Sequence, residues 1–457
     1  MNSTSAPIQK IDIGMFLDSS PLLGMQKLVI FMAAMAIILD GFDSQLIGFA
    51  IPQLMEEWGV SRAAFSSVLA AGLIGMAIGM ACGGCLADRI GRSRVLATSC
   101  LLFGTATILI GFASNVEGVT ILRFIVGLGI GAALPCAATL TAEYTPARQR
   151  TMAITLTIVC FPLGGMIAGL FAAWVLSRHG WQWLFWVGGS MPILLSLLLF
   201  VFLPESPRYL ARHQRRWPEL IHILKRMGHT ISESSEFADS AERPSPKRLG
   251  FKALFQAAFA RDTIAICLAF FSVVLSLYSA FNWLPAVLSA EGLSMALASQ
   301  ALAAHNLGGV LGSLFCAYAI TRFGSRIPLL ICGSLAALSA FAMLGLDISH
   351  NAGLVIAGFG VHGFFVNAVQ TSLYGLCAHV YPTEVRATGM ATALAFGRIG
   401  GILSAFIGAA VITFGGLSGF LVMLGAGMAA AVIALLLVRS HLPGKKSSAR
   451  LATANAH

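Results

Sequence analysis

Charge is the scarcest property of this sequence. Only 11% of its 457 residues are Asp, Glu, Lys or Arg, whereas soluble globular domains carry about 25%. Conversely, 57% of the residues are hydrophobic and the mean hydropathy is +0.83. This composition excludes an ordinary soluble domain and is typical of a protein embedded in a membrane.

Motifs that carry covalent chemistry are also missing. The nine cysteines are an odd number and lie in or beside apolar stretches, so we expect no disulfide framework. The sequence has no metal-ligand cluster, nucleophile elbow or phosphate loop. Residues 358–363 have the glycine spacing of a dinucleotide-binding loop, but they lie in an apolar stretch without a preceding strand. These absences argue against an enzyme and predict neither a cofactor nor a metal site.

Long apolar runs, by contrast, are abundant. A helix needs about 20 apolar residues to cross the hydrocarbon core of a membrane. Twelve such runs give the predicted spans 27–51, 63–87, 95–113, 116–138, 151–175, 184–203, 263–289, 297–320, 327–346, 353–377, 388–413 and 416–438. The predicted fold class is therefore an all-α membrane protein with twelve transmembrane helices in two six-helix halves.

One long polar stretch divides the chain. The predicted organisation is a cytoplasmic N-terminal tail (1–26), a first half (27–203), a cytoplasmic central loop (204–262), a second half (263–438) and a cytoplasmic C-terminal tail (439–457). Within the loop, residues 217–227 have an amphipathic pattern that suits a helix lying at the membrane surface.

The placement of Lys and Arg predicts the orientation, because short cytoplasmic loops collect these residues. If both termini are cytoplasmic, 25 of the 29 basic residues lie inside, and only Arg62 and Arg178 lie outside. Arg123 and Arg398 lie within spans. The net charge of +10 is thus a signal of topology rather than of nucleic-acid binding. We expect a multi-pass protein of a bacterial-type inner (plasma) membrane, in contact with the lipid bilayer.

The two halves repeat each other weakly. Arg89-Ile-Gly91 recurs as Arg322-Phe-Gly324, and the pair Pro146 and Arg150 recurs as Pro382 and Arg386. The matches share an offset of about 233–236 residues, which indicates a parallel duplication.

Ionisable groups at membrane depth are costly and point to function. Asp40 and Asp43 lie three residues apart in the first span, hence on one helix face. Two neighbouring carboxylates repel each other, so one of them retains a proton more readily and is a candidate proton carrier. The alternative is a structural ion pair, or a position near the lipid headgroups.

Each half also carries one cation inside a span. The guanidinium groups of Arg123 and Arg398 present a planar fork suited to a carboxylate, so both are candidates to bind an anionic substrate. Arg123 could instead form a lasting pair with the acids of the first span, and Arg398 could lie in a packed turn among Gly397, Gly400 and Gly401.

Aromatic and amide side chains complete the candidate substrate site. Asn282 and Trp283 lie at the end of the seventh span, and Asn367, Gln370 and Tyr374 lie in the tenth. Such residues suit a planar ring with polar substituents. Trp283 could alternatively belong to the aromatic belt at the membrane surface.

The loop sequence 84–94, Gly-Cys-Leu-Ala-Asp-Arg-Ile-Gly-Arg-Ser-Arg, is similar to the motif between the second and third helices of the major facilitator superfamily. Within that superfamily, Asp40-Gly41-Phe42-Asp43 resembles the aromatic acid:proton symporters, such as 4-hydroxybenzoate and benzoate transporters. The resemblance covers roughly residues 25–440 and implies a major facilitator fold.

The resemblance also implies roles. Asp40 and Asp43 would serve proton coupling, and Arg123 and Arg398 would bind the substrate's charge. Gating would involve Gly84, Asp88, Arg89, Gly91, Arg92, Glu143 and Arg150. The second copy of the loop motif departs from the pattern, with Thr321 where an acid often stands and Ser325 at the position of Arg92, which puts a gate lock there in doubt.

The function predicted at this stage is proton-coupled uptake of a small aromatic carboxylate, similar to hydroxybenzoate, by alternating access. The expected partners are a small organic anion, protons and lipid, and the expected functional unit is a monomer. A uniporter or exporter for another organic acid, a sugar-like compound or a drug remains open, as does a membrane sensor of aromatic acids.

Overall fold

The computed structural model describes residues 10–19, 21–227, 231–232, 235–238, 254–256, 259–346, 351–381 and 383–443. The outermost parts of both predicted tails, most of residues 228–258 in the central loop, and Pro382 of the repeated motif lie outside the described residues.

Eleven long apolar helices form the bundle in the described part of the chain. The first half contains α2 (Gly24–Trp58), α3 (Arg62–Ile90), α4 (Arg92–Ile110), α5 (Val116–Tyr144), α6 (Ala147–Val175) and α7 (Gln182–Phe202). The second half contains α10 (Ala260–Ala290), α11 (Met295–Phe323), α12 (Arg326–Ala342) with the 3₁₀ turn η4 (Met343–Gly345), α13 (Ala352–Val380) and α14 (Thr383–Leu437).

The last of these helices accounts for two predicted spans. Gly416 interrupts α14 with non-helical angles, φ 55° and ψ −146°, a left-handed φ that glycine adopts without a Cβ penalty. The kink separates two legs that correspond to the predicted spans 388–413 and 416–438. Counted this way, the described helices make twelve crossings, and the predicted fold class is confirmed.

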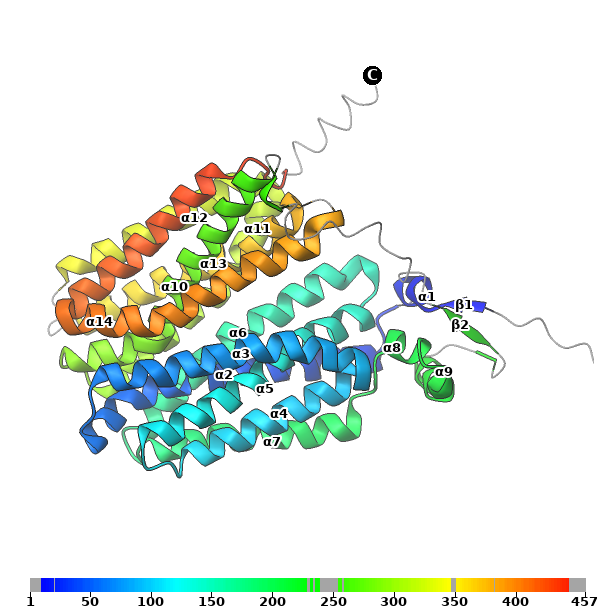
Figure 1. Ribbon diagram of the computed structural model, residues 1–457, viewed down its shortest axis with the longest axis horizontal. Helices are drawn as coiled ribbons and strands as arrows, with labels where there is room; N and C mark the ends of the chain where they lie inside the picture. Colours follow the sequence, from blue (N-terminus) through cyan, green and yellow to red (C-terminus); the bar gives the residue numbers. More distant parts are fainter. Residues whose placement is uncertain are drawn as a thin grey trace, which may run out of the picture.

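The two halves lie side by side, with α2 to α7 in the lower part of Figure 1 and α10 to α14 in the upper part. Packing within a half depends on small residues. Gly79 of α3 lies against the backbone of Leu128 in α5, and Gly131 of α5 lies against Met76 in α3, with no room for a Cβ at either glycine. Such close backbone approach is how helices associate where no hydrophobic effect drives them.

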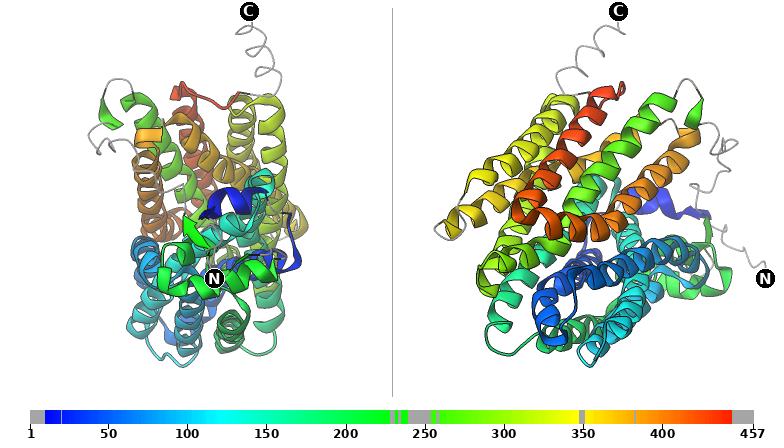
Figure 2. Two further views of the ribbon diagram at one scale, coloured as in Figure 1. Left: turned by 90° about the vertical axis from the view of Figure 1, so that its right-hand side faces the viewer. Right: turned by 60° about the vertical axis from the view of Figure 1, so that its left-hand side comes forward.

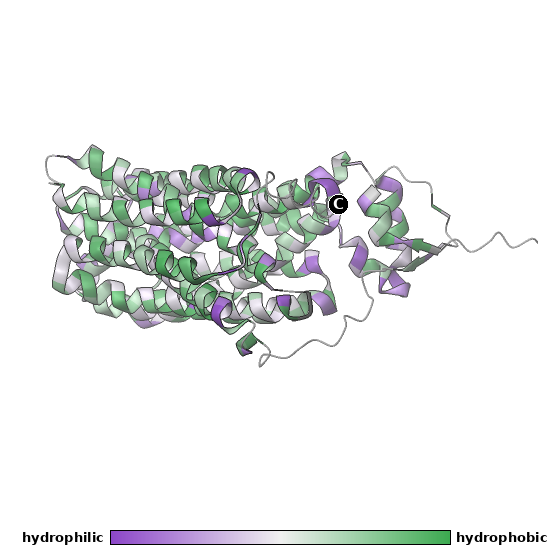
Figure 3. Cartoon of the chain, turned by 90° about the horizontal axis from the view of Figure 1, so that it is seen from above, coloured by the Kyte–Doolittle hydropathy of each residue, from purple (hydrophilic) through white to green (hydrophobic). Residues whose placement is uncertain are grey.

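A small polar layer, which we call the cap, covers one end of the first half. It consists of residues 10–19 and the described part of 204–238, and contains β1 (Lys10–Asp12), α1 (Ile13–Ser19), α8 (Pro207–Ala211), the 3₁₀ turn η1 (Gln214–Arg216), α9 (Trp217–Arg226) and β2 (Glu236–Ala238). Strands β1 and β2 pair in parallel, with Ile11 opposite Phe237. The cap elements lie together at the right of Figure 1, and hydrophilic residues are frequent there in Figure 3.

The amphipathic segment 217–227 does form a helix, α9, but its apolar side chains face protein rather than lipid. Leu220, Ile223 and Leu224 are buried, and Trp217 makes an edge-to-face contact with Phe237 of β2 at 5.5 Å between ring centroids. The sequence pattern shows that the helix has an apolar face but does not reveal which partner covers it. The expectation of a helix lying on the membrane is therefore wrong for these side chains.

The contacts between the halves are distributed unevenly along the bundle. Within the described residues, side-chain hydrogen bonds across the halves join Gln45 to Asn306, and Met76 to Tyr278 and Arg398. All of these lie at the middle of the bundle or toward the end opposite the cap, which we call the far end. The views in Figure 2 show the two halves as separate groups of helices.

Candidate functional site

A cavity of about 280 Å³ lies between the halves, at the lower limit of ligand pockets, which span roughly 300–1,000 Å³. Its wall is mostly apolar and includes five aromatic rings, those of Phe161, Phe270, Tyr278, Phe281 and Tyr374. Its polar lining comes from Asp40, Asn367, Gln370, Thr371 and Arg398. The wall includes Leu134 and Ala138 of α5, which lie toward the cap end of that helix, so the cavity extends toward the cap.

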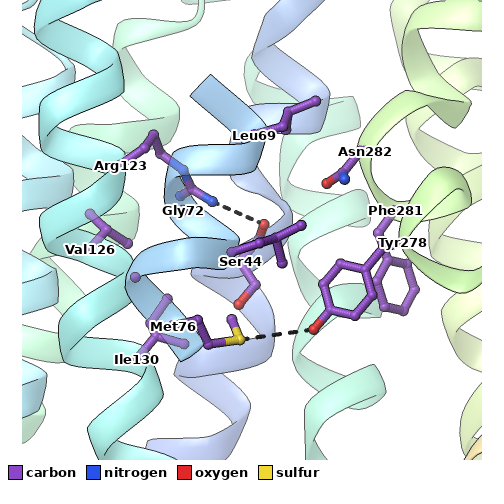
Figure 4. A pocket seen from close by; sticks show the side chains of 12 residues that line it. Ser44, Leu69, Gly72, Met76, Arg123, Val126, Ile130, Tyr278, Phe281 and Asn282 are labelled. Carbon is purple, nitrogen blue, oxygen red and sulfur yellow. Dashed lines mark hydrogen bonds between the residues drawn. The ribbon is translucent and has the colours of Figure 1, made fainter. Parts of the chain in front are cut away.

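A second, much narrower pocket of about 20 Å³ adjoins this cavity toward the far end, with room for about one water molecule. Figure 4 shows Arg123 and Ser44 on the first-half side and Tyr278 and Asn282 of α10 on the other. Met76 and Tyr278 line both spaces. This narrow pocket therefore lies between the wide cavity and the far end.

The two intramembrane cations have different environments. Arg123 pairs with Asp43, with 3.4 Å between Nη1 and Oδ1, and Nη2 donates to the backbone carbonyl of Ser44 at 3.3 Å. Thr107 of α4 donates its hydroxyl to the other carboxylate oxygen of Asp43. The structure thus shows the internal pair that the sequence left open as an alternative for Arg123.

Arg398 lines the central cavity and forms no ion pair among the described residues. Its Nη1 lies 3.2 Å from the hydroxyl oxygen of Tyr278 and 2.9 Å from the sulfur of Met76. Arg398 is partly buried, and Asp40 of the same cavity attracts its guanidinium electrostatically without forming an ion pair with it. The direct hydrogen bonds of the guanidinium to side chains are thus to neutral groups, and desolvation of such a cation is costly unless an anion joins it. The geometry therefore makes Arg398 the cation available to a ligand carboxylate.

Asp40 is the acid that lines the same cavity. Its side chain is 2% exposed and accepts a hydrogen bond of 3.1 Å from the hydroxyl of Ser44. The adjoining Ser44 carbonyl is the acceptor of Arg123. Asp40 therefore faces the cavity, whereas Asp43 faces α4 and α5.

The remaining predicted substrate residues divide into two groups. Asn367, Gln370 and Tyr374 line the central cavity, and Asn282 lines the narrow pocket. Trp283 lies apart from both: it is fully buried within the second half and its Nε1 donates to the carbonyl of Ser404 at 3.3 Å. Because protein encloses its ring, Trp283 is not a residue of the membrane-surface belt.

The predicted gating residues gather at the cap end of the first half. Arg92 pairs with Glu143 and more loosely with Asp88, at 3.6 Å, and Ser206 donates its hydroxyl to Glu143. All of these partners belong to the first half or the cap. In this conformation the motif holds one half together and makes no bridge to the other within the described residues.

Glu205 organises this cluster. Its Oε1 accepts backbone hydrogen bonds from Arg92 at 2.8 Å, Ser93 at 3.1 Å and Ser206 at 2.9 Å, so the carboxylate caps the start of α4 where the helix dipole favours an anion. Gly91 has φ 107°, and the carboxylate fills the space that a Cβ would need. Glycine is therefore required at position 91 on two grounds.

The other gating candidates are more dispersed. The Arg89 carbonyl accepts the hydroxyl of Tyr209 at 2.9 Å, and Arg150 pairs with Asp18 of α1. Gly84 has no neighbour near its Cβ position. At the position equivalent to Arg92 in the second half, Ser325 accepts the backbone N–H of Leu442 at 2.9 Å, which is a neutral contact.

Sequence reasoning assigned no individual role to several residues of these sites, although it noted Tyr278 in the aromatic stretch at the end of the seventh span and Glu205 in a motif shared with the superfamily. Tyr278, Thr107, Asp18 and Glu205 each contact a predicted site residue. Glu205 lies between Pro204 and Pro207 directly after a span, a pattern that could have marked it as a helix-capping residue. The roles of Thr107 and Asp18 depend on packing between segments distant in sequence, for which a single sequence gives no signal.

Two six-helix halves around a central, mostly apolar cavity with a few charged and amide side chains define a membrane transport protein. The family model of the Major Facilitator Superfamily matches residues 33–344 and 266–456, and the chain belongs to this superfamily.

Known proteins are similar to this chain along nearly its whole length. A gallate transporter of Pseudomonas putida is 33% identical over 427 residues, covering 93% of this chain and 94% of the relative. The 4-hydroxybenzoate transporter PcaK of the same organism is 34% identical over 420 residues, covering 91% and 93%. The inward-open structure of the xylose transporter XylE from E. coli matches with a TM-score of 0.70 and 19% identity, covering 93% and 99%. At that identity the last likeness concerns the fold alone.

Proposed function

We propose that this protein is a secondary transporter that takes up a small aromatic carboxylate, similar to hydroxybenzoate, together with protons by alternating access. The named substrates of the gallate and 4-hydroxybenzoate transporters support the substrate class. The aromatic wall of the central cavity is consistent with a planar ring.

The observation that carries the proposal is Arg398. It is the cation that lines the central cavity and it forms no ion pair in the described structure, although Asp40 attracts it electrostatically; Tyr278 of α10 lies within hydrogen-bond distance of its guanidinium. A substrate carboxylate would supply the missing anion through charge-assisted hydrogen bonds, while Asn367 and Gln370 would face the ring substituents.

Asp40 is the proposed proton carrier. It lines the cavity beside the substrate position, while Asp43 is engaged by Arg123 and Thr107. Protonation of Asp40 would remove a buried charge and so ease closure of the cavity around it. Proton uptake and substrate binding would thus occur at one site.

The proposed setting is an inner membrane with both termini and the cap cytoplasmic, as the Lys and Arg placement favours. The cavity then opens to the cytoplasm in this conformation. A single chain provides both halves and the complete cavity, so the proposed functional unit is a monomer.

The deciding experiment uses purified protein in proteoliposomes with radiolabelled 4-hydroxybenzoate and gallate. An imposed proton gradient, acidic on the far-end side, should drive accumulation. Arg398→Gln should raise KM about 10- to 100-fold, because a hydrogen bond to a charged group contributes about 1.5–3 kcal/mol. Arg216→Gln, a change on the surface of the cap, is the matched control. Unchanged uptake by Arg398→Gln would refute the assignment.

Asp40→Asn tests proton coupling separately. Accumulation driven by the gradient should be lost, while exchange of labelled for unlabelled substrate at equal pH should remain, because exchange needs no net proton movement. Glu117→Gln, at the start of α5, should leave both activities unchanged. Gradient-driven accumulation at the normal rate in Asp40→Asn would show that Asp40 carries no coupled proton.

A further inference from the structure

The side chains of Gln45 and Asn306 form a reciprocal pair of amides across the two halves. Gln45 Nε2 donates to Asn306 Oδ1 at 3.1 Å, and Asn306 Nδ2 donates to Gln45 Oε1 at 2.7 Å. Gln45 is 1% exposed and Asn306 is fully buried. Asn306 is further fixed by a bond of 2.9 Å from Nδ2 to the carbonyl of Leu302 in its own helix.

The pair lies on the far side of the central cavity from the cap. Gln45 follows Asp40 and Asp43 along α2, which runs from the cap end toward Trp58, and α11 begins at the far end with Met295. The pair therefore lies where the halves are closed, beyond the cavity that extends toward the cap.

Close packing surrounds the amides. A Cβ at Gly165 of α6 would collide with the side chains of both Gln45 and Asn306, and a Cβ at Gly169 would lie 2.8 Å from that of Ala303 in α11. On the other side of α2, a Cβ at Gly48 would lie 2.6 Å from the carbonyl oxygen of Phe281 in α10. Backbones of opposite halves thus touch on both sides of the pair.

The chemistry of the pair suits a contact that must open repeatedly. Each amide satisfies the other while both are buried, and water can satisfy both after the halves separate, so neither state leaves an unpaired polar group. The other side-chain hydrogen bonds across the halves in the described structure use the sulfur of Met76 as acceptor, which is a weak acceptor.

We propose that Gln45 and Asn306 are the latch that keeps the far end closed while the cavity is open toward the cap, and that the latch must separate before substrate enters from the far end. The inference rests on the alternating access of the proposed function. It assigns to two neutral amides a role in setting the balance between the two conformations.

The test measures that balance without any substrate. Ala63 of α3 and Phe414 of α14 are both exposed at the far end, and each is replaced by cysteine and spin-labelled. Double electron–electron resonance spectroscopy in lipid nanodiscs then measures the distance between the halves. The exposed Cys82 and Cys85 are first replaced by alanine. Gln45→Leu and Asn306→Leu should each raise the population with a long distance at least fivefold.

Gln53→Leu is the matched control, because Gln53 lies on the same helix and donates to the Leu176 carbonyl of its own half at 3.3 Å. It should leave the distances unchanged. The exchange variant Gln45→Asn with Asn306→Gln retains both amides and should restore the original distribution, which separates loss of the latch from poor folding. Gly169→Leu inserts bulk between the halves and should also lengthen the distance.

The outcomes separate the two proposals. A shift in Gly169→Leu without one in Gln45→Leu or Asn306→Leu would overturn the latch but keep alternating access. No shift in any variant would overturn both. An equal shift in Gln53→Leu would also overturn the latch. A shift confined to Gln45→Leu, Asn306→Leu and Gly169→Leu, together with no uptake of aromatic acids, would support the latch and refute the proposed substrate class.

Discussion

The buried pair of Arg123 and Asp43 allows a quantitative test of how charge is held inside this bundle. The side chains are 7% and 1% exposed and their closest charged atoms are 3.4 Å apart. At an effective dielectric constant of about 20, two unit charges at that distance attract by about 5 kcal/mol. Desolvation offsets much of this attraction, whereas removing one partner leaves the other buried and unpaired, at a cost of about 3–5 kcal/mol.

We expect Arg123→Met and Asp43→Asn each to lower the free energy of unfolding by about 3 kcal/mol, toward the lower limit of that range. Thr107 still donates to Asp43 when Arg123 is removed, and two backbone carbonyls remain for Arg123 when Asp43 is neutralised. The double variant removes both charges together, so it should lose no more than about 3 kcal/mol, and the coupling energy should be at least about 3 kcal/mol.

The assay is reversible unfolding in mixed micelles with increasing SDS, followed by far-ultraviolet circular dichroism. Arg216 and Glu219 provide the control cycle, since they form an exposed pair at 2.8 Å with side chains 23% and 43% exposed, for which we expect a coupling of about 0.5 kcal/mol or less. A coupling for Arg123 and Asp43 no larger than that of the control would refute the reasoning.

Two further predictions concern the cap end and the cavity. Gly91→Ala should destabilise the first half by about 1–3 kcal/mol, because φ is left-handed there and the Glu205 carboxylate occupies the Cβ space; the same SDS titration measures the loss, and an unchanged midpoint would contradict it. Tyr278→Phe removes the hydroxyl beside Arg398 and should raise KM for 4-hydroxybenzoate several-fold with little change in kcat; an unaltered KM would show that this hydroxyl does not orient the guanidinium.

The large-scale architecture is accessible from sequence because it is set mainly by the transfer of apolar helices into the hydrocarbon core of the membrane. Runs of about 20 apolar residues can only be spans, and the positions of Lys and Arg give an orientation for them. The tightest connections, between the third and fourth and between the last two predicted spans, are the ambiguous ones, and the second of these is where the non-helical angles of Gly416 interrupt α14. The prediction of twelve spans holds because a left-handed glycine reverses the chain without a loop.

The site is only partly accessible from sequence. Scarcity of charge in the spans points directly to Asp40, Asp43, Arg123 and Arg398. It does not show which acid meets which cation, because that depends on the rotation of α2: Asp43 turns toward Arg123, while Asp40 turns toward the cavity. Neutral residues such as Gln45 cannot be identified from sequence for a further reason. Amide side chains are common, and the role proposed for Gln45 depends on its contact with Asn306 in the other half.

The pairing of β1 with β2 has a consequence for biosynthesis. Residues 10–12 leave the ribosome long before residues 236–238, and at 5–20 residues per second the first strand waits roughly 10 to 45 s for its partner. In the described structure, the ion pair of Asp18 with Arg150 and the hydrogen bonds of Tyr209 with Arg89 and of Tyr144 with Glu205 tie the cap to the first half. Six helices and their cap can therefore form a finished folding unit while the second half is still being translated, and the nascent N-terminal strand is the part most in need of protection during that interval.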